Sequence, residues 1–203
     1  MTSHPPYLDL PVRQFLGQLA GPEPAPSGGG AAALAVSMGA GLCAMAARLS
    51  SRQLTAAEAG DLATAAQRTA TRAASLVQAD ADSYQCVIAA RRQPAGPDGD
   101  GESRRRQIAA ALSDAAAVPM EIVELAVLVA RLAARLAADG NPSLRGDAIT
   151  GALLAEAGAR AAAVLVGINL AGAADDSRPA RAEQLAKETA SLAAAARHSV
   201  NRA

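Results

Sequence analysis

Aromatic residues are nearly absent from this 203-residue chain, which has one phenylalanine, two tyrosines and no tryptophan. Proteins that bind single-stranded nucleic acid stack the bases on aromatic side chains. Strands of β-sheets are also enriched in aromatic and β-branched residues. We therefore expect neither a surface for single-stranded nucleic acid nor a β-rich fold.

The chain also lacks an excess of charge of either sign. It has 19 basic and 19 acidic residues, which give a formal net charge of zero, and its isoelectric point is about 6.7. A nucleic-acid-binding domain normally carries a basic patch that neutralises phosphates. No nucleic-acid partner is therefore expected.

Side chains that bind metal ions are scarce. Cys43 and Cys86 are far apart without a CxxC spacing, and the two histidines, His4 and His198, lie near the ends of the chain. We therefore expect no metal site. The opening residues have no basic segment followed by an apolar one, so a signal peptide is not predicted. Together with the low cysteine content, this favours a reduced, cytoplasmic setting.

A long uncharged run extends from Ser27 to Ala47. It is about as long as the ~20 apolar residues that a membrane-spanning helix needs. Most of its residues, however, are alanine, glycine, serine or cysteine, and only five are large and apolar. This composition is more typical of a buried helix in a soluble protein, so we expect no membrane partner.

Alanine, the strongest helix former, is abundant throughout. Proline, glycine and capping residues divide the chain into six expected helical segments, with a kink or split at Pro119 and a mobile loop at about 93–103. The segments are 11–20, 31–49, 55–92, 104–139, 147–170 and 179–200. The sequence thus predicts a single all-α domain over residues 1–203, an antiparallel bundle of about five or six helices.

Asp80, in the segment ADADSY, is the most informative candidate for a functional residue. At 100° per residue it falls in the middle of an apolar stripe that includes Leu76, Tyr84 and Val87, whereas Asp82 faces away. A buried carboxylate must be paired or hydrogen-bonded. Asp80 is therefore either held by a serine, threonine or backbone donor, or acts as a general acid, a base or a stabiliser of a cation.

The segment ADGNPSLRGDAITG contains two further candidates, Asn141 and Asp147. Gly140, Asn141 and Pro142 form an expected turn. Asp147 either caps the following helix or faces a ligand at its N-terminus. Asn169 lies ~33 Å farther along one straight helix. Asp147 and Asn169 therefore belong to different sites, or to one site shared between two subunits.

The glycine triplet at 28–30 matches neither common phosphate-binding motif, because no strand precedes it and no GK[ST] follows it. Its backbone amides either face a ligand at the start of a helix or form a tight entry turn, with Ser27 as the expected cap. Gly39 and Gly41, farther along this helix, each cost ~1 kcal/mol relative to alanine. We therefore expect a neighbouring helix to approach closely there.

Six segments in the same order as in a known family give the chain a resemblance to that family. They are FLGQLA, PAPSGGGAAALAVSMGAGL, ADADSY, AAAVPMEIVELA, ADGNPSLRGDA and INL. The chain resembles the formiminotransferase-cyclodeaminase C-terminal family, which includes stand-alone bacterial methenyltetrahydrofolate cyclohydrolases. The resemblance implies a cytoplasmic, homodimeric helical bundle that acts on a tetrahydrofolate derivative as substrate, with no permanently bound cofactor.

The resemblance also implies which residues form the site. The implied catalytic residues are Asp80, Asp82 and Asp147. The implied substrate-binding residues are Ser27, Gly28, Gly29 and Gly30, as a loop facing the ligand, with Tyr84, Asn141 and Asn169. The residues themselves favour Asp80 over Asp82 as the group nearest the reacting carbon.

Two reactions are known in this family: hydrolysis of 5,10-methenyltetrahydrofolate to 10-formyltetrahydrofolate, and cyclisation of 5-formiminotetrahydrofolate with release of ammonia. Because no formiminotransferase region is attached, the resemblance favours the cyclohydrolase. The alternatives are the cyclodeaminase and a non-catalytic helical dimer. The last is favoured by Leu165, which replaces the first asparagine of the family's NVxIN motif. Further departures are Gly146, in place of the usual serine, and RRQPAGPDGDGE, in place of a Leu-Pro-Lys segment.

Overall fold

The computed structural model describes residues 6–93 and 101–199, and regular structure within these ranges is entirely helical. Most of the loop expected at 93–103 lies outside the described residues. The predicted all-α fold is confirmed. The elements are η1 (Tyr7–Asp9), α1 (Val12–Leu19), α2 (Gly28–Arg48), α3 (Ala56–Arg92), α4 (Glu102–Ala115), α5 (Ala117–Asp139), η2 (Pro142–Leu144), α6 (Arg145–Asn169) and α7 (Arg178–His198).

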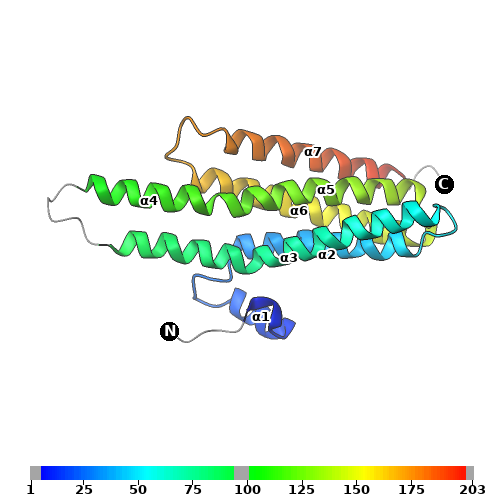
Figure 1. Cartoon of the computed structure of the whole chain (residues 1–203), viewed down its shortest axis with the longest axis horizontal. Coiled ribbons are helices and arrows are strands. Elements are labelled where there is room, and N and C mark those ends of the chain that lie inside the picture. Colours follow the sequence, from blue (N-terminus) through cyan, green and yellow to red (C-terminus); the bar gives the residue numbers. More distant parts are fainter. Residues whose placement is uncertain (1–5, 94–100, 200–203) are drawn as a thin grey trace.

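The long helices run side by side along one axis (Figure 1). Helix α2 packs against α3 and α6, while α5 packs against α6 and α7 and also contacts α2 and α3. Helix α1 lies outside this bundle, below α3 in the view of Figure 1. In that view α2 and α6 form the more distant layer, behind α3 and α5.

The start of α3 follows from its sequence. Thr55 Oγ1 accepts a hydrogen bond from the Glu58 amide at 3.2 Å, and Glu58 Oε2 accepts one from the Thr55 amide at 3.0 Å. This reciprocal capping box satisfies two amides that the first turn would otherwise leave unpaired. The predicted helix start at this position is confirmed.

Pro119 divides the fourth expected segment into α4 and α5, as predicted. The break lies at Ala116, three residues before the proline, so that Pro119 occupies the first turn of α5. Proline is tolerated there because the first-turn amides have no intrahelical partner. Helices α4 and α5 consequently continue in nearly the same direction (Figure 1).

The observed starts of α2 and α6 differ from the prediction in ways that bear on the candidate site residues. Helix α2 begins at Gly28 rather than Ala31, so the glycine triplet forms its first turn and is not a loop. Helix α6 begins at Arg145, directly after the short helix η2, and its N-cap is Leu144. The capping role considered for Asp147 is therefore wrong, because Asp147 is already the third residue of the helix.

Small residues let the central helices approach closely. A Cβ atom added at Gly39 would lie 2.7 Å from the carbonyl oxygen of Gly151, and one added at Gly151 would lie 2.9 Å from that of Gly39. The expected close contact is thus confirmed at Gly39. It is wrong at Gly41, which is exposed and has no heavy atom within 4 Å of the position of an added Cβ.

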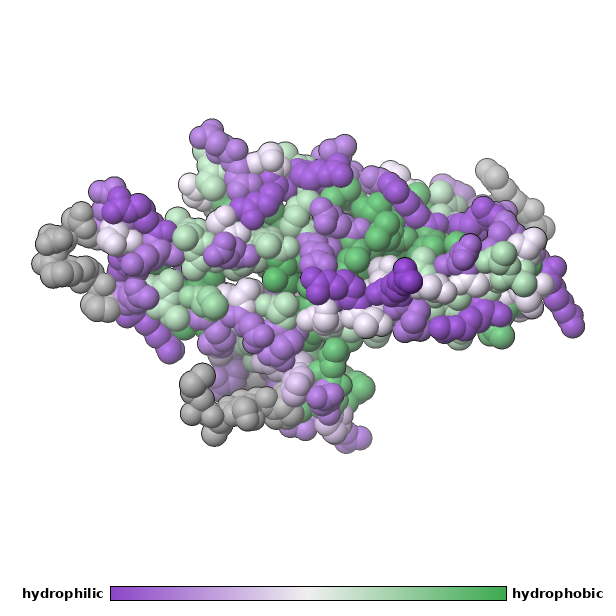
Figure 2. Space-filling model, viewed as in Figure 1, coloured by the Kyte–Doolittle hydropathy of each residue, from purple (hydrophilic) through white to green (hydrophobic). Residues whose placement is uncertain are grey.

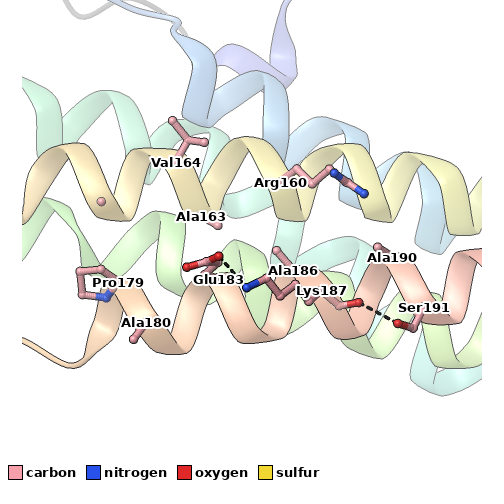
Figure 3. Close-up of a pocket in the computed structure, with 11 residues that line it drawn as sticks. Arg160, Ala163, Val164, Pro179, Ala180, Glu183, Ala186, Lys187, Ala190 and Ser191 are labelled. Atoms are coloured by element: carbon pink, nitrogen blue, oxygen red, sulfur yellow. Dashed lines mark hydrogen bonds and ion pairs between the residues drawn. The ribbon is translucent and has the colours of Figure 1, made fainter.

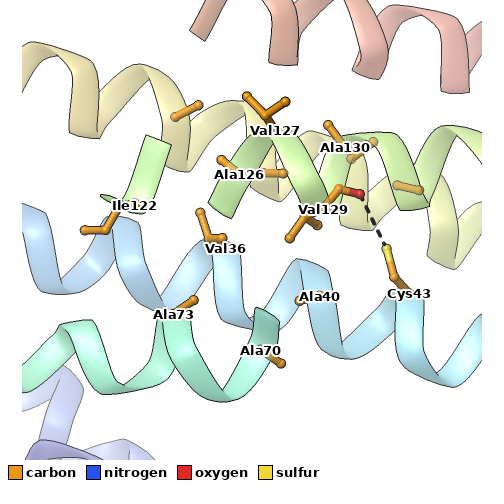
Figure 4. Close-up of a cluster of buried hydrophobic side chains, with 14 of the residues drawn as sticks. Val36, Ala40, Cys43, Ala70, Ala73, Ile122, Ala126, Val127, Val129 and Ala130 are labelled. Carbon is orange, nitrogen blue, oxygen red and sulfur yellow. Dashed lines mark hydrogen bonds between the residues drawn. The ribbon is translucent and has the colours of Figure 1, made fainter. Parts of the chain in front are cut away.

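The core between these helices is built from small aliphatic side chains (Figure 4). Val36 and Ala40 of α2 meet Ala73 of α3, and Ile122 and Val129 come from α5. In the part of the chain that the structure describes, two segments, α2 and Pro142–Asn169, are long and apolar enough to cross a membrane by length and composition. Core helices of soluble proteins pass the same test, and more than half of the α2 window is buried in the bundle.

Candidate functional site

A cavity of about 260 Å³ lies where the start of α2, the C-terminal half of α3, the α4–α5 junction and the end of α6 meet. It brings together five of the predicted site residues: Ser27, Gly28, Asp80, Tyr84 and Asn169. The other residues that line it are Pro24, Ser83, Ala115, Pro119, Leu165 and Ile168.

Asp80 is buried, with 9% of its surface exposed. Its Oδ2 atom accepts hydrogen bonds from Ser27 Oγ at 2.9 Å and from the Gly30 amide at 3.0 Å. Gly30 is the third residue of α2, and its amide is one of those that have no intrahelical partner. Asp80 therefore caps α2 from another helix. Ser27 occupies the N-cap position but makes no side-chain cap bond of its own.

Only at the middle glycine of the triplet would an added side chain collide with a neighbouring group. A Cβ atom at Gly29 would overlap the Asp80 carboxylate. At Gly30 the nearest atom to such a Cβ, Val77 Cγ1, would be 3.6 Å away, and at Gly28 no heavy atom lies within 4 Å. The absence of a side chain at Gly29 is thus what admits the carboxylate to the first turn of α2.

Opposing effects act on the charge of Asp80. Burial raises the pKa of its carboxyl group above the ordinary value of 3.8, whereas the hydrogen bonds from Ser27 and Gly30 lower it, and burial dominates. Among the described residues, no hydrogen bond reaches Oδ1. The site therefore presents a carboxylate with one oxygen fixed, the other free of protein donors, and a basicity greater than that of an exposed aspartate.

None of the other six lining residues was predicted as a site residue, and three of them lie within or beside the predicted motifs. Ser83 Oγ donates to the backbone carbonyl of Asp80 at 2.9 Å. Leu165 and Ile168 precede Asn169 by four and one positions on α6 and line the cavity with it. The sequence contained a signal for these residues. Ser83 lies within ADADSY, and Leu165 is three positions before Ile168 and four before Asn169, so that the three share a face of the helix.

Asp82 lies outside the cavity, on the face that the helical spacing predicts. Its Oδ1 atom accepts a hydrogen bond from Gln78 Nε2 at 2.8 Å, and the Gln78 side-chain oxygen accepts the Tyr7 amide at 3.3 Å. Desolvation raises the pKa of Tyr7, and the negative charge of Asp82 adds to this increase. Asp82 thus faces the N-terminal segment beside α3.

Asn141 and Asp147 lie at the opposite end of α6 from Asn169. The Asn141 side chain donates to the Leu49 carbonyl at 3.0 Å, and its backbone amide donates to Ser50 Oγ at 2.9 Å. These bonds join the end of α2 to the turn before α6. Since α6 runs from Arg145 to Asn169, Asp147 and Asn169 are ~33 Å apart along the helix.

Within residues 6–93 and 101–199, no group of three or more histidine, cysteine, aspartate or glutamate side chains could hold a metal ion. Cys43 is buried, and desolvation raises the pKa of its thiol to about 12. Its Sγ atom lies 3.9 Å from the Val129 carbonyl oxygen (Figure 4). A thiol of this kind stays protonated, so it is a packing group rather than a nucleophile.

A larger hollow, of about 840 Å³, lies between α6 and α7 (Figure 3). Alanines and Val164 form much of its lining. On the α7 side, Lys187 Nζ and Glu183 Oε1 form an ion pair at 2.7 Å. None of the predicted site residues lines this hollow. Chemical function is therefore better placed in the smaller cavity, which contains the buried carboxylate.

Comparison with known proteins adds independent information. A family model described as formiminotransferase-cyclodeaminase matches residues 11–190. A methenyltetrahydrofolate cyclohydrolase from Methylorubrum extorquens is 32% identical over 192 residues, which cover 91% of this chain and 89% of that protein. A formimidoyltransferase-cyclodeaminase from Sus scrofa is 29% identical over 181 residues, which cover 87% of this chain but 34% of that protein.

The fold also matches a solved structure. The crystal structure of a formiminotetrahydrofolate cyclodeaminase from Thermotoga maritima aligns with a TM-score of 0.78 at 22% sequence identity, over 96% of each chain. At this level of identity, the match establishes a shared fold.

Proposed function

This chain belongs to the formiminotransferase-cyclodeaminase family, and from this premise we propose that it hydrolyses 5,10-methenyltetrahydrofolate to 10-formyltetrahydrofolate. The cyclohydrolase relative supports this choice, because its alignment extends over 89% of that protein. The pig protein is matched over only about a third of its length. We further propose a cytoplasmic homodimer that uses the folate as substrate and holds no permanent cofactor.

The observation that carries the proposal is the buried Asp80 carboxylate in the cavity. The methenyl carbon of the substrate lies between N5 and N10 in a cationic amidinium group. A fixed negative charge in a site of low polarity stabilises such a cation and the charge that moves during its reaction. Ser27 and Gly30 hold the carboxylate in one position, so little reorganisation is needed when the substrate reacts.

Asp80 also serves as the general base. Water adds to the methenyl carbon and forms a tetrahedral carbon, while Asp80 accepts a proton from that water. The bond between the carbon and N5 then breaks, N5 gains a proton, and the oxygen remains in the formyl group on N10. One water is consumed and one proton is released. Burial raises the pKa of Asp80 and makes it a stronger base for this step.

Polar side chains around the carboxylate are suited to hold the pteridine ring. Tyr84 lies one helical turn from Asp80, and the Asn169 amide can both donate and accept hydrogen bonds. The cavity is smaller than the ~300–1,000 Å³ of typical ligand pockets. We therefore place the reacting end of the folate in the cavity and its glutamate end outside it. The roles of Asp82, Asn141 and Asp147 remain predictions.

The second candidate is the cyclodeaminase reaction, supported by the relatives from pig and Thermotoga maritima. In that reaction N10 attacks the formimino carbon on N5, a tetrahedral carbon forms, and the bond to the imino nitrogen breaks. The hydrogen of N10 is transferred to that nitrogen, which gains one further proton and leaves as ammonia. The protonated form of Asp80 would supply that proton.

A direct assay tests the proposal. The purified protein is mixed with 5,10-methenyltetrahydrofolate, and the loss of near-ultraviolet absorbance is compared with that in buffer alone. We expect faster loss with the wild-type chain, a fall of at least tenfold in Asp80→Asn, and a much smaller effect in Asp82→Asn, whose side chain lies outside the cavity.

No acceleration by the wild-type chain would contradict the hydrolase proposal. The formimino substrate with ammonia detection is then the next assay, and activity there would establish the cyclodeaminase. Failure of both assays, with the fold intact by circular dichroism, would identify a non-catalytic helical dimer.

A further inference from the structure

We propose that the backbone amide of Gly28 is a catalytic group of the cavity at Asp80: its N–H donates a hydrogen bond to the attacking water and then to the oxygen of the formyl product. The inference rests on the proposed function, because it concerns the oxygen atom that hydrolysis adds. It follows from the hydrogen bonds in the first turn of α2 and from the position of the buried carboxylate.

The first turn of an α-helix leaves its backbone amides without intrahelical acceptors. In α2 the Gly30 amide donates instead to Asp80 Oδ2 at 3.0 Å. Ser27, at the N-cap position, makes no side-chain cap bond. Among the described residues, no acceptor pairs with the amides of Gly28 and Gly29. Two donors at the start of α2 therefore have no protein partner.

Of these two amides, that of Gly28 faces the open part of the cavity. Gly28 lines the cavity, and a Cβ atom added to it would meet no heavy atom within 4 Å. Gly29 is buried against the Asp80 carboxylate. First-turn amides point along the helix axis into the space before the helix. The Gly28 N–H is therefore directed to where a small ligand atom can lie.

A free amide at a helix start is ordinarily solvated, but here a second unpaired group lies beside it. Asp80 lines the same cavity and is only 9% exposed, and among the described residues no hydrogen bond reaches its Oδ1 atom. Its Oδ2 atom is bound to the Gly30 amide, and first-turn amides two residues apart are ~4 Å from each other. A donor and a buried acceptor without protein partners thus meet at one wall of the cavity.

One water molecule matches these two groups. Its oxygen accepts the N–H of Gly28 through one lone pair, and one of its O–H groups donates to Asp80 Oδ1. The second lone pair of the oxygen is then free to attack the methenyl carbon. A water held in this way is already oriented for attack, and its proton is already within reach of the base.

The amide follows the oxygen through the reaction. The carbon–oxygen bond forms while Asp80 takes one proton from the water, which leaves a hydroxyl group on the tetrahedral carbon. Asp80 passes this proton to N5 as the carbon–N5 bond breaks. It then accepts the hydroxyl proton as the carbonyl group forms, and release of that proton to solvent restores the carboxylate. The Gly28 N–H donates to the same oxygen in each state and stabilises the carbonyl oxygen as it forms.

The other walls of the cavity offer this oxygen few polar partners. The residues that α4, α5 and α6 contribute are Ala115, Pro119, Leu165, Ile168 and Asn169, of which only the last is polar. Surface hydropathy does not mark the position either, because hydrophilic and hydrophobic residues are mixed along the near face of the bundle (Figure 2). The unpaired groups at the start of α2 therefore determine where the oxygen lies.

Gly28→Pro removes the donor with little change to the helix. Gly28 is the first residue of α2, a position that favours proline. Ser27 has the extended conformation, with φ −129° and ψ −169°, that suits a residue before proline. Gly28→Ala also adds a side chain but keeps the N–H. We expect the kcat of Gly28→Pro to be ~100-fold lower than that of Gly28→Ala, with a similar KM.

Ala56→Pro is the control for a proline at a helix start. Ala56 is the exposed first residue of α3, and Thr55 before it is extended. It lies ~36 Å along α3 from Asp80, so this variant should keep the kcat of the wild type. If Gly28→Pro turns over as fast as Gly28→Ala, the amide takes no part in the reaction and the proposal is overturned.

A backbone ester removes the same N–H without adding a ring. Glycolic acid in place of Gly28, introduced by nonsense suppression, puts an ester oxygen at the position of the amide nitrogen. We expect the same ~100-fold loss in kcat. The product 10-formyltetrahydrofolate should bind roughly threefold to tenfold more weakly by isothermal titration calorimetry. An ester chain that is folded by circular dichroism and equals the wild type in both measurements would overturn the proposal, whatever the proline variant shows.

These outcomes separate the role of the amide from the hydrolase assignment. A wild-type chain that does not hydrolyse 5,10-methenyltetrahydrofolate would overturn both proposals. Wild-type hydrolysis that depends on Asp80 but is unaffected by loss of the Gly28 N–H would uphold the hydrolase and overturn this inference alone. Loss of kcat in both the proline and the ester variants, with KM and the folded state retained, would support it.

Discussion

The carboxylate of Asp80 caps α2 from a neighbouring helix, because its Oδ2 atom accepts the amide hydrogen of Gly30 at 3.0 Å across a separation of 50 residues. The group proposed to act on the substrate is therefore also part of the fold. Substitutions in the first turn of α2 should change both the stability of the bundle and the position of the carboxylate.

Gly29→Ala tests this coupling most directly. The new Cβ would overlap the Asp80 carboxylate, so the side chain must move and its bonds to Ser27 and Gly30 must break. We expect a loss of ~1–3 kcal/mol in the free energy of unfolding, typical of overpacking, and a fall in cyclohydrolase activity. Urea unfolding and the absorbance assay measure the two effects.

Gly60→Ala is the matched control for this prediction. Gly60 is exposed within α3, and an added Cβ there meets no heavy atom within 4 Å. Alanine should stabilise the helix at this position by up to ~1 kcal/mol. If Gly29→Ala is as stable and as active as Gly60→Ala, the close contact between Gly29 and Asp80 does not exist in solution.

The stability of Asp80→Asn relative to wild type should depend on pH. Because the folded pKa of Asp80 is raised above 3.8, the protonated carboxyl group favours the folded state. This contribution is fully present below the unfolded pKa and is lost as the pH rises through the folded pKa. We therefore expect Asp80→Asn to gain stability relative to wild type as the pH rises from the ordinary aspartate pKa of 3.8 through the raised folded pKa.

Urea unfolding of both proteins at several pH values across this range checks the prediction. Asp82→Asn is the control, since its side chain is exposed. An Asp80→Asn variant that loses stability relative to wild type as the pH rises would show that the bonds from Ser27 and Gly30 outweigh the cost of burial.

Much of the fold could be predicted because its signals are local. The capping box at Thr55 and the break before Pro119 depend on residues within one helical turn. The inward direction of Asp80 follows from the spacing of apolar residues along one helix. The resemblance to the family's motifs, rather than helical spacing, predicted that Ser27, Tyr84 and Asn169 belong to one site.

The rest depends on how distant helices meet. Ser27 was expected to cap its own helix, but its hydroxyl group donates to Asp80, 53 positions along the chain. The three glycines at 28–30 are identical in sequence, and only the crossing of α2 and α3 decides that Gly29 meets the carboxylate. Likewise Gly39 packs against α6 while Gly41, two positions on, faces outward.

Arg178 should matter for the attachment of α7. Its guanidinium group donates to Asp176 Oδ2 at 2.7 Å, to the Ser113 carbonyl at 2.9 Å and to Ser113 Oγ at 2.7 Å. These bonds join the start of α7 to the end of α4. Arg178→Gln keeps the hydrogen bond from the backbone amide of residue 178 to Asp176 Oδ1. It removes the guanidinium group, whose charge and planar set of donors glutamine cannot replace, so we expect a lower melting temperature.

The effect of Arg178→Gln should diminish in acid. The hydrogen bonds from Arg178 lower the pKa of Asp176 to about 2, so the contribution of this carboxylate is present above its unfolded pKa and is lost as the pH falls toward 2. Melting curves at neutral pH, pH 4 and pH 2.5 should show the difference from wild type shrinking. Arg181→Gln, at an exposed position of α7, is the control. A difference that is constant with pH would contradict the coupling between Arg178 and Asp176.

Gly39→Ala should separate the packing of the central helices from the chemistry of the cavity. The added Cβ would lie 2.7 Å from the Gly151 carbonyl oxygen and 3.4 Å from Val129 Cγ1, and a backbone oxygen cannot move as a flexible side chain can. We expect a loss of ~1–3 kcal/mol in stability, measured by urea unfolding. Because Gly39 lies about two and a half helical turns from Gly30, the turnover of molecules that remain folded should change little. A Gly39→Ala variant that is more stable than wild type would show that α2 and α6 are farther apart than in this structure.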